Sequence, residues 1–245
     1  MMFLGIDAGT RFTKAVLWNG EISRFAVKET VGNMKSVLES ITKEIEDYKL
    51  CCATGSGAEL VEFADAREDD VVCLAIAGRD VVNADYVIDI GAQSITAISV
   101  DEDGNVIDYV KNDKCASGSG KFLEVMSSAL GIEIQDLDNL AFRSNKKLSI
   151  TSQCAVFAES EVISYVNNGE SRENIIAAVC DAVAKIAASQ VNKLKITGRY
   201  TITGGVANFT SITERIKRII GGDYVKFPNP QLAAAIGAGI VAGEL

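Results

Sequence analysis

The stretch FLGIDAGTRFTKAVLW, residues 3–18, sets the architecture of the chain. Its first half reads as a β-branched strand that ends in an Asp-x-Gly turn, Asp7–Gly9, and its second half reads as another alternating strand. Asn19-Gly20 then marks a tight turn into a third strand. The stretch therefore predicts a β-meander whose first turn presents a carboxylate beside a glycine.

The same pattern recurs as YVIDIGAQSITAISV, residues 86–100. Its Asp-x-Gly turn aligns Asp89 with Asp7, an offset of 82 residues (89 − 7). Asp103-Gly104 again predicts a turn into a third strand. Two short hairpins can share such residues by chance, but the common order favours an internal duplication and an α/β fold of two lobes.

Helical segments occupy much of the remaining chain. Apolar spacing predicts helices over 34–46 and over 171–194, the second with Ser171 as its N-cap. A strand over 199–203 runs into a Gly-Gly turn, and a further helix is expected over about 208–219.

The two expected lobes differ in how much of the chain they use. Residues 1–84 should form the first lobe, and residues 85–229 should form the second, with the boundary near Asp85. The tail is rich in Ala and Gly, so residues 230–245 should pack back closely on the first lobe.

The composition excludes several classes of function. The net charge is −9 and no basic stripe is present, so we expect no nucleic-acid partner. The chain has no His, which removes imidazole as a metal ligand or general base. It shows no secretory signal, and its apolar tail is shorter than the roughly 20 residues that span a bilayer. We expect a cytoplasmic protein without a membrane partner, whose six cysteines serve metal chemistry, redox chemistry or packing.

The paired Asp-x-Gly turns predict a nucleotide site. Glycine lets backbone N–H groups approach phosphates, and a carboxylate at a strand end can hold Mg²⁺ through its waters. The first turn adds the hydroxyls of Thr10 and Thr13 and the ammonium of Lys14. Asp89 would face them across a cleft between the lobes, and the Gly-rich stretch over 203–208 would meet the base or ribose.

Cys115 and Cys154 suggest a metal site. Each lies just before a predicted helix, whose N-terminal partial positive charge favours a thiolate and suits an anionic cluster. A four-thiolate iron–sulfur cluster needs four cysteines, which a twofold dimer would supply. Spacing alone still favours simple burial of both residues. We assign the remaining cysteines to packing: Cys51, Cys52, Cys73 and Cys180.

Several of these stretches together resemble one protein family. The most specific are NDKCASGSGKFLEVM over 112–126, SQCAVFAESEVIS over 152–164 and PQLAAAIGAGIVA over 230–242, supported by GIDAGT, TGSG, IDIGAQ and GGVAN. The chain is similar to the ATP-dependent activators of 2-hydroxyacyl-CoA dehydratases and the ATPase subunits of benzoyl-CoA reductases, the BadF/BadG/BcrA/BcrD type. These belong to the superfamily of acetate kinase, heat-shock protein and actin.

The resemblance implies a fold and an activity. The fold would be a duplicated, two-lobe actin-like ATPase with ribonuclease H-like lobes and an interlobe nucleotide cleft. ATP and Mg²⁺ would bind there, and a homodimer would share one 4Fe–4S cluster. A ferredoxin or flavodoxin would donate the electron, and a dehydratase or reductase would accept it at low potential.

The resemblance also assigns roles to residues. Asp7 and Asp89 would be the catalytic carboxylates, and Cys115 and Cys154 would hold the cluster. The nucleotide-binding residues that it implies are Gly9, Thr10, Arg11, Thr13, Lys14, Gly91, Gln93, Gly204, Gly205, Val206 and Gln231.

The ATP motifs depart from the family pattern more than the cysteine motifs do. In the second phosphate turn, Ala92, Ser94 and Thr96 stand where the family has Gly, Asp and Lys. Loss of that carboxylate puts metal handling and the hydrolysis rate in question. Arg11-Phe12 also brings bulky side chains into the first turn.

Two other functions fit parts of the sequence. A small-molecule kinase of the same superfamily could use Asp89 as a base, but it would leave the cysteine pair unexplained. A subunit that binds nucleotide without fast hydrolysis would keep the dimer and the cluster. Of Glu159 and Glu161, at least one is expected on a solvated helix face, and Lys121 fits either the surface or a role near cluster charge.

Overall fold

The computed structural model describes residues 1–112 and 117–245, and the chain divides into two compact units. Unit 1 comprises Met1–Val87, Ile98–Asp108 and Lys226–Leu245, and unit 2 comprises Ile88–Ala97 and Tyr109–Val225. Cys115 lies outside the described residues. The lobe boundary near Asp85 stays a prediction.

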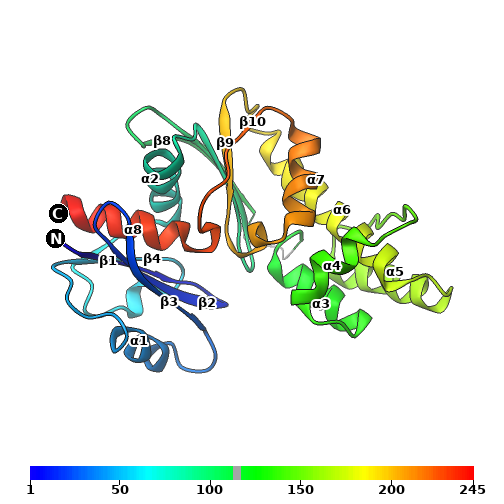
Figure 1. Cartoon of the computed structure of the whole chain (residues 1–245), viewed down its shortest axis with the longest axis horizontal. Coiled ribbons are helices and arrows are strands. Elements are labelled where there is room, and N and C mark those ends of the chain that lie inside the picture. Colours follow the sequence, from blue (N-terminus) through cyan, green and yellow to red (C-terminus); the bar gives the residue numbers. More distant parts are fainter. Residues whose placement is uncertain (113–116) are drawn as a thin grey trace. The chain divides into compact units, whose positions relative to one another are not determined.

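A five-stranded sheet of order β3-β2-β1-β4-β5 forms the centre of unit 1 (Figure 1). β1 runs antiparallel to β2 and parallel to β4, so Asp7 stands opposite Lys14 on one side and opposite Thr54 on the other. The strands are β1 (Phe3–Ala8), β2 (Phe12–Trp18), β3 (Ile22–Glu29), β4 (Cys51–Thr54) and β5 (Ala66–Arg67).

The helices of unit 1 are α1 (Met34–Thr42), α2 (Asp70–Val82) and α8 (Ala233–Glu244), with short 3₁₀ turns η1 (Ala58–Leu60) and η4 (Pro230–Leu232). α1 is shorter than the predicted helix over 34–46. The N–H groups of Glu44 and Ile45 both donate to the carbonyl of Ile41, which turns the chain. This turn buries Ile45 in the core beneath β1, so tertiary packing ends the helix.

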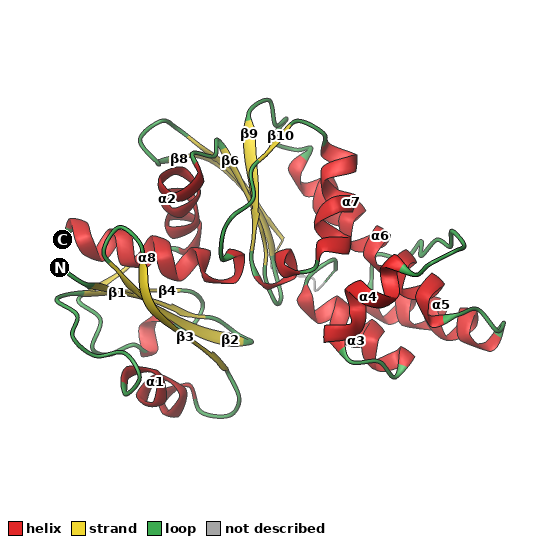
Figure 2. Ribbon diagram, in the orientation of Figure 1, coloured by secondary structure: helices red, strands yellow, loops and turns green. Residues whose placement is uncertain are grey.

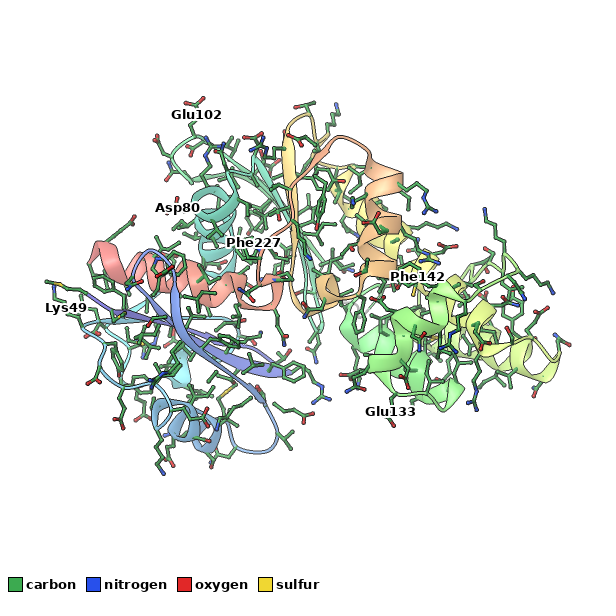
Figure 3. All side chains as sticks on the ribbon, viewed as in Figure 1. Lys49, Asp80, Glu102, Glu133, Phe142 and Phe227 are labelled. Atoms are coloured by element: carbon green, nitrogen blue, oxygen red, sulfur yellow. The ribbon has the colours of Figure 1, made fainter. Side chains whose placement is uncertain are left out.

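Helix α8 lies against β1, β4 and α2, and its small residues permit very close backbone contact. A Cβ atom at Gly237 would stand 1.8 Å from the carbonyl oxygen of Cys73 in α2. The apolar cluster between α2 and α8 also contains Phe227, labelled in Figure 3. The tail of the chain is therefore a structural part of unit 1.

The second sheet repeats the topology of the first. Its order is β10-β9-β6-β7-β8, and read from β8 it matches the order β3-β2-β1-β4-β5 strand for strand. The duplication predicted from the Asp-x-Gly repeats is therefore confirmed. The strands are β6 (Tyr86–Ile90), β7 (Ile95–Val100), β8 (Val106–Asn112), β9 (Arg199–Thr203) and β10 (Asp223–Tyr224).

Unit 2 adds most of the helices that follow the duplicated meander (Figure 2). They are α3 (Gly120–Leu130), α4 (Leu137–Phe142), α5 (Ala155–Asn167), α6 (Arg172–Val191) and α7 (Thr210–Ile220), with 3₁₀ turns η2 (Ile134–Asp136) and η3 (Gly205–Asn208). Among the described helices, α6 has the length and the mean hydropathy, 1.3, of a membrane span. However, 78% of its apolar window is buried in the protein, as in the core helix of a globular domain.

Helix α7 begins two residues later than predicted from its spacing. Its first N–H groups, on Thr210 and Ser211, donate to the carboxylate of Asp138 in α4 at 2.7 and 2.9 Å. Asp138 also accepts from the Ser211 hydroxyl. A residue 72 positions earlier thus caps the helix, which local sequence could not reveal.

Candidate nucleotide and cluster sites

Asp7 and Lys14 form an ion pair at the first Asp-x-Gly turn. Lys14 Nζ lies 2.6 Å from Asp7 Oδ2, and both side chains are largely buried. Their position follows from the hairpin register, in which the two residues stand opposite each other on β1 and β2. A carboxylate and a cation at one strand end suit a metal-bound phosphate, since one would attract the metal and the other the phosphate oxygens.

Gly55 completes this corner of unit 1. It follows β4, its φ is +87°, and a Cβ atom there would stand 2.5 Å from Asp7 Oδ1. Only glycine can bring the backbone this close to the carboxylate. The sequence predicts no site role for Gly55, although it lies in the Thr-Gly-Ser-Gly run directly after a short strand.

The residues of the first turn have different environments. Thr10 is exposed, whereas the hydroxyl of Thr13 is buried and lies 3.0 Å from that of Thr30. Thr30 also donates to the Gly9 carbonyl at 2.9 Å, which braces the turn. Arg11 pairs with the carboxylate of Glu29. Thr10 is thus accessible, while Thr13 is engaged inside the unit; the nucleotide role of both stays a prediction.

The second Asp-x-Gly turn lies beside the Gly-Gly turn of β9. Thr203 Oγ1 donates to Asp89 Oδ1 at 2.9 Å, across neighbouring strands. Gly204 has φ +85°, and a Cβ atom there would stand 2.3 Å from the carbonyl oxygen of Ile90. The structure therefore joins the second Asp-x-Gly turn and the Gly-Gly turn, whose residues Asp89 and Thr203 are 114 positions apart.

Helix α3 begins on the same turn. The N–H groups of Gly120 and Lys121 donate to the carbonyls of Gly91 and Ala92 at 2.9 and 2.8 Å. Val206, in η3, lies against Gly120, because a Cβ atom at Gly120 would be 3.7 Å from Val206 Cγ2. The sequence predicts a cysteine loop in this segment, whereas its contact with the second turn is visible only in the structure.

The remaining predicted nucleotide residues are distributed over both units. In unit 2, Gln93 is exposed beside the turn and Gly205 begins η3. In unit 1, Gln231 lies in η4, which contacts β2 and leads into α8. Ser94 closes the second turn, since its carbonyl accepts from the N–H of Gly91 at 2.9 Å, and Thr96 is buried in β7.

Cys154 is the N-cap residue of α5, and its side chain is exposed. Its carbonyl accepts the first bond of the helix from the N–H of Ala158 at 2.9 Å. An accessible thiol at a helix N-terminus fits an anionic iron–sulfur cluster, because the helix end supplies partial positive charge and the exposed side chain leaves space for the cluster.

Glu161 holds the segment that leads to Cys154. Its two carboxylate oxygens accept from the N–H groups of Thr151 and Ser152, each at 2.9 Å, and from both hydroxyls. Burial opposes ionisation of this carboxyl, but the bonds from Ser152 and Thr151 outweigh it and lower its pKa. Glu161 therefore binds a loop rather than simply facing solvent.

The loops before α3 and before α5 meet in unit 2. Ser117 is two residues after Cys115 in sequence and is buried, and its hydroxyl donates to the carbonyl of Gln153. Gln153 directly precedes Cys154. Lys121 is paired with Glu124 at 3.2 Å on the surface of α3, which favours its surface role.

The other described cysteines are buried, as predicted. Cys51 and Cys52 point into different apolar clusters on opposite faces of β4. Burial raises the pKa of Cys51 to about 12 and those of Cys52 and Cys180 to about 11, and it also raises the pKa of Cys73. Cys154 is the only exposed thiol among the residues that the structure describes.

Comparison with known proteins agrees with these features. The model of the BadF/BadG/BcrA/BcrD ATPase family matches residues 4–242. The (R)-2-hydroxyglutaryl-CoA dehydratase activating ATPase of Acidaminococcus fermentans is 34% identical, with 98% of this chain and 96% of that protein covered.

Solved structures show the same fold. The activator of the 2-hydroxyisocaproyl-CoA dehydratase from Clostridium difficile, with bound ADPNP, has a TM-score of 0.93 and 30% identity and covers 100% of this chain and 95% of its own. A glucokinase of the ROK family from Streptomyces griseus has a TM-score of 0.64 over 100% of both chains at 12% identity, which shows the fold alone. The predicted actin-like ATPase fold is confirmed.

Proposed function

Because the chain belongs to the BadF/BadG/BcrA/BcrD ATPase family, we propose that it is an ATP-dependent electron-transfer activator. In this role it passes low-potential electrons to a dehydratase or reductase component. The observation that carries the proposal is the exposed thiol of Cys154 at the start of α5, in a protein whose other described cysteines are all buried.

We assign nucleotide binding to the two Asp-x-Gly turns. The bound ADPNP of the C. difficile activator supports this assignment. Asp7 would hold Mg²⁺ through its waters, and Lys14, now 2.6 Å from Asp7, would turn to the phosphate oxygens. Asp89, oriented by Thr203, would serve as the second carboxylate.

We assign the cluster to Cys115 and Cys154. Their neighbours Ser117 and Gln153 are joined by a hydrogen bond, which supports a common site. Two cysteines per chain leave a four-thiolate cluster half complete, so a second copy of the chain would supply the rest. When bound, a 4Fe–4S cluster stores one electron.

We expect the electron to come from a ferredoxin or flavodoxin in the cytoplasm. ATP can change the cluster environment only through a difference in its affinity for two conformations of the dimer. The chain's contribution is to make the cysteine loops respond to the nucleotide, and hydrolysis would then return the protein to its first conformation.

A subunit that binds nucleotide without fast hydrolysis is the second candidate. Ser94 carries no carboxylate, and its carbonyl is already engaged in closing the turn with Gly91. Buried Thr96 offers no cation at the phosphate turn. These features favour slow turnover but do not weaken binding through Asp7 and Lys14.

Iron and sulfide analysis of anaerobically purified protein tests the cluster. We expect about four irons per two chains, as one 4Fe–4S cluster requires. Cys115→Ser and Cys154→Ser should each lose the cluster, while Cys52→Ala, at a buried site, should keep it. A wild-type dimer without iron would refute the electron-transfer role.

Nucleotide assays separate the two candidates. Asp7→Asn should weaken Mg²⁺–ATP binding at least about tenfold, the effect of losing about 1.4 kcal/mol. Asp80→Asn, which alters an exposed carboxylate on α2 (Figure 3), should not. Tight binding with negligible hydrolysis in wild type would favour the non-hydrolysing subunit, and turnover dependent on a sugar or acid would favour a kinase.

A further inference from the structure

The exposed thiol of Cys154 belongs to a residue whose backbone is held on both sides. After it, the Cys154 carbonyl starts the hydrogen-bond ladder of α5. Before it, the Gln153 carbonyl accepts from Ser117, and the two preceding residues are bound to Glu161. The side chain is free to reach a ligand while its main chain is fixed.

The position of Glu161 on α5 lets its carboxylate reach the residues just before Cys154. Glu161 follows Cys154 by seven residues, which is about two helical turns, so it lies on the same side of the helix as the N-cap. α5 itself is anchored against α3 and α6 through the buried residues Ala158 and Val162. Glu161 thus connects α5, which is buried at these two residues, to a largely exposed loop.

The bonds to Glu161 engage the backbone and hydroxyl donors of both Thr151 and Ser152. Both N–H groups of Thr151 and Ser152 and both hydroxyls point to one carboxylate, and both of its oxygens take part. A hydroxyl or amide in place of the carboxylate could not accept all four. The arrangement has no equivalent at Glu159, which makes none of these bonds although it lies two residues away on the same helix.

We propose that Glu161 is a positioning residue for Cys154, fixing Thr151 and Ser152 so that the thiol is presented to the cluster in one geometry. The inference rests on the proposed function. Groups that orient a metal ligand commonly affect metal retention 10–100-fold although they never touch the metal.

The test compares Glu161→Gln with Glu159→Gln, which makes the same change of charge on the same helix. In metal-free protein, hydrogen exchange at the amides of Thr151 and Ser152 should become at least about tenfold faster in Glu161→Gln only. In anaerobic holoprotein, loss of the cluster to a chelator should also become about tenfold faster, in line with other indirect ligand contacts. The EPR signal of the reduced cluster should become heterogeneous.

Glu161→Asp provides a rescue variant, because it restores the charge with a shorter reach. Glu161→Asp should recover part of the cluster lifetime. If Glu161 served only general stability, Glu161→Gln would instead lower the unfolding midpoint of the protein. Unchanged cluster lifetime and EPR signal in Glu161→Gln would overturn the positioning role, even if amide exchange became faster. Absence of iron from wild type would overturn the proposed function, and the positioning role with it.

Discussion

Ser117 donates a hydrogen bond to the carbonyl of Gln153, 36 residues further along the chain. Ser117 also leads into α3, whose first N–H groups hold the carbonyls of Gly91 and Ala92 in the second Asp-x-Gly turn. A continuous set of contacts therefore runs from a candidate phosphate turn to the residue before Cys154.

We expect Ser117→Ala to uncouple Cys154 from the nucleotide. In metal-free wild type, ADPNP should change the alkylation rate of Cys154 by about fivefold or more. Fivefold is about the smallest change in affinity that typical coupling between two sites produces. The variant should bind ADPNP normally but lose this response. Mass spectrometry of the alkylated peptide measures the rate.

Ser189→Ala is the matched control for this experiment. The Ser189 hydroxyl donates to the Ile186 carbonyl within its own helix. Ser189→Ala therefore deletes the same kind of bond, but one that does not link two loops. A full nucleotide response in Ser117→Ala would show that coupling follows another route.

Asp138→Ala should destabilise unit 2 by about 1–2 kcal/mol. The substitution removes the acceptor for the first N–H groups of α7 and for the Ser211 hydroxyl. Asp136→Ala is the control, since Asp136 makes no side-chain cap bond to α4. Urea unfolding monitored by circular dichroism gives both values, and equal midpoints for the two variants would contradict the capping role.

Gly237→Ala should destabilise unit 1 by about 1–3 kcal/mol or more, although alanine favours helices. A Cβ atom there would lie 1.8 Å from the backbone oxygen of Cys73, so α2 and α8 would have to separate. A Cβ atom added by Gly243→Ala in the same helix would have the Phe3 ring as its nearest neighbour, at 3.3 Å. Thermal unfolding should show a lower midpoint for Gly237→Ala alone; a similar change in both variants would argue against tight helix packing.

The buried thiols should make metal-free protein less stable in alkali. Burial raises the pKa of Cys180 to about 11, whereas an unfolded thiol titrates near about 8.5. The stabilising contribution of its neutral form is complete below the unfolded value and is lost as pH rises towards the folded value. Each such thiol adds a slope of up to about 1.4 kcal/mol per pH unit.

Cys180→Ala should reduce that slope between about pH 9 and 10.5. Urea unfolding at a series of pH values measures the difference. Parallel stability curves for wild type and Cys180→Ala would show that this thiol does not ionise on unfolding.

Local pattern was sufficient to identify the two meanders, the duplicated Asp-x-Gly turns and a cysteine before α5. These features depend on neighbours within a few residues, through strand alternation, turn chemistry and capping. It was also sufficient to predict that Cys51 and Cys52 serve packing, and both are buried on β4. Helix ends were less predictable, because buried Ile45 and distant Asp138 determine where α1 stops and α7 starts.

Folding in three dimensions brought together groups that the linear order keeps apart. Asp89 meets Thr203 across 114 residues, and Ser117 meets Gln153 across 36. Such partners are chosen by strand order and helix packing, which depend on the burial of the whole core rather than on any short pattern. For this reason residue types could indicate nucleotide and cluster chemistry, while the contacts that orient Asp89 and Cys154 became visible only in the folded chain.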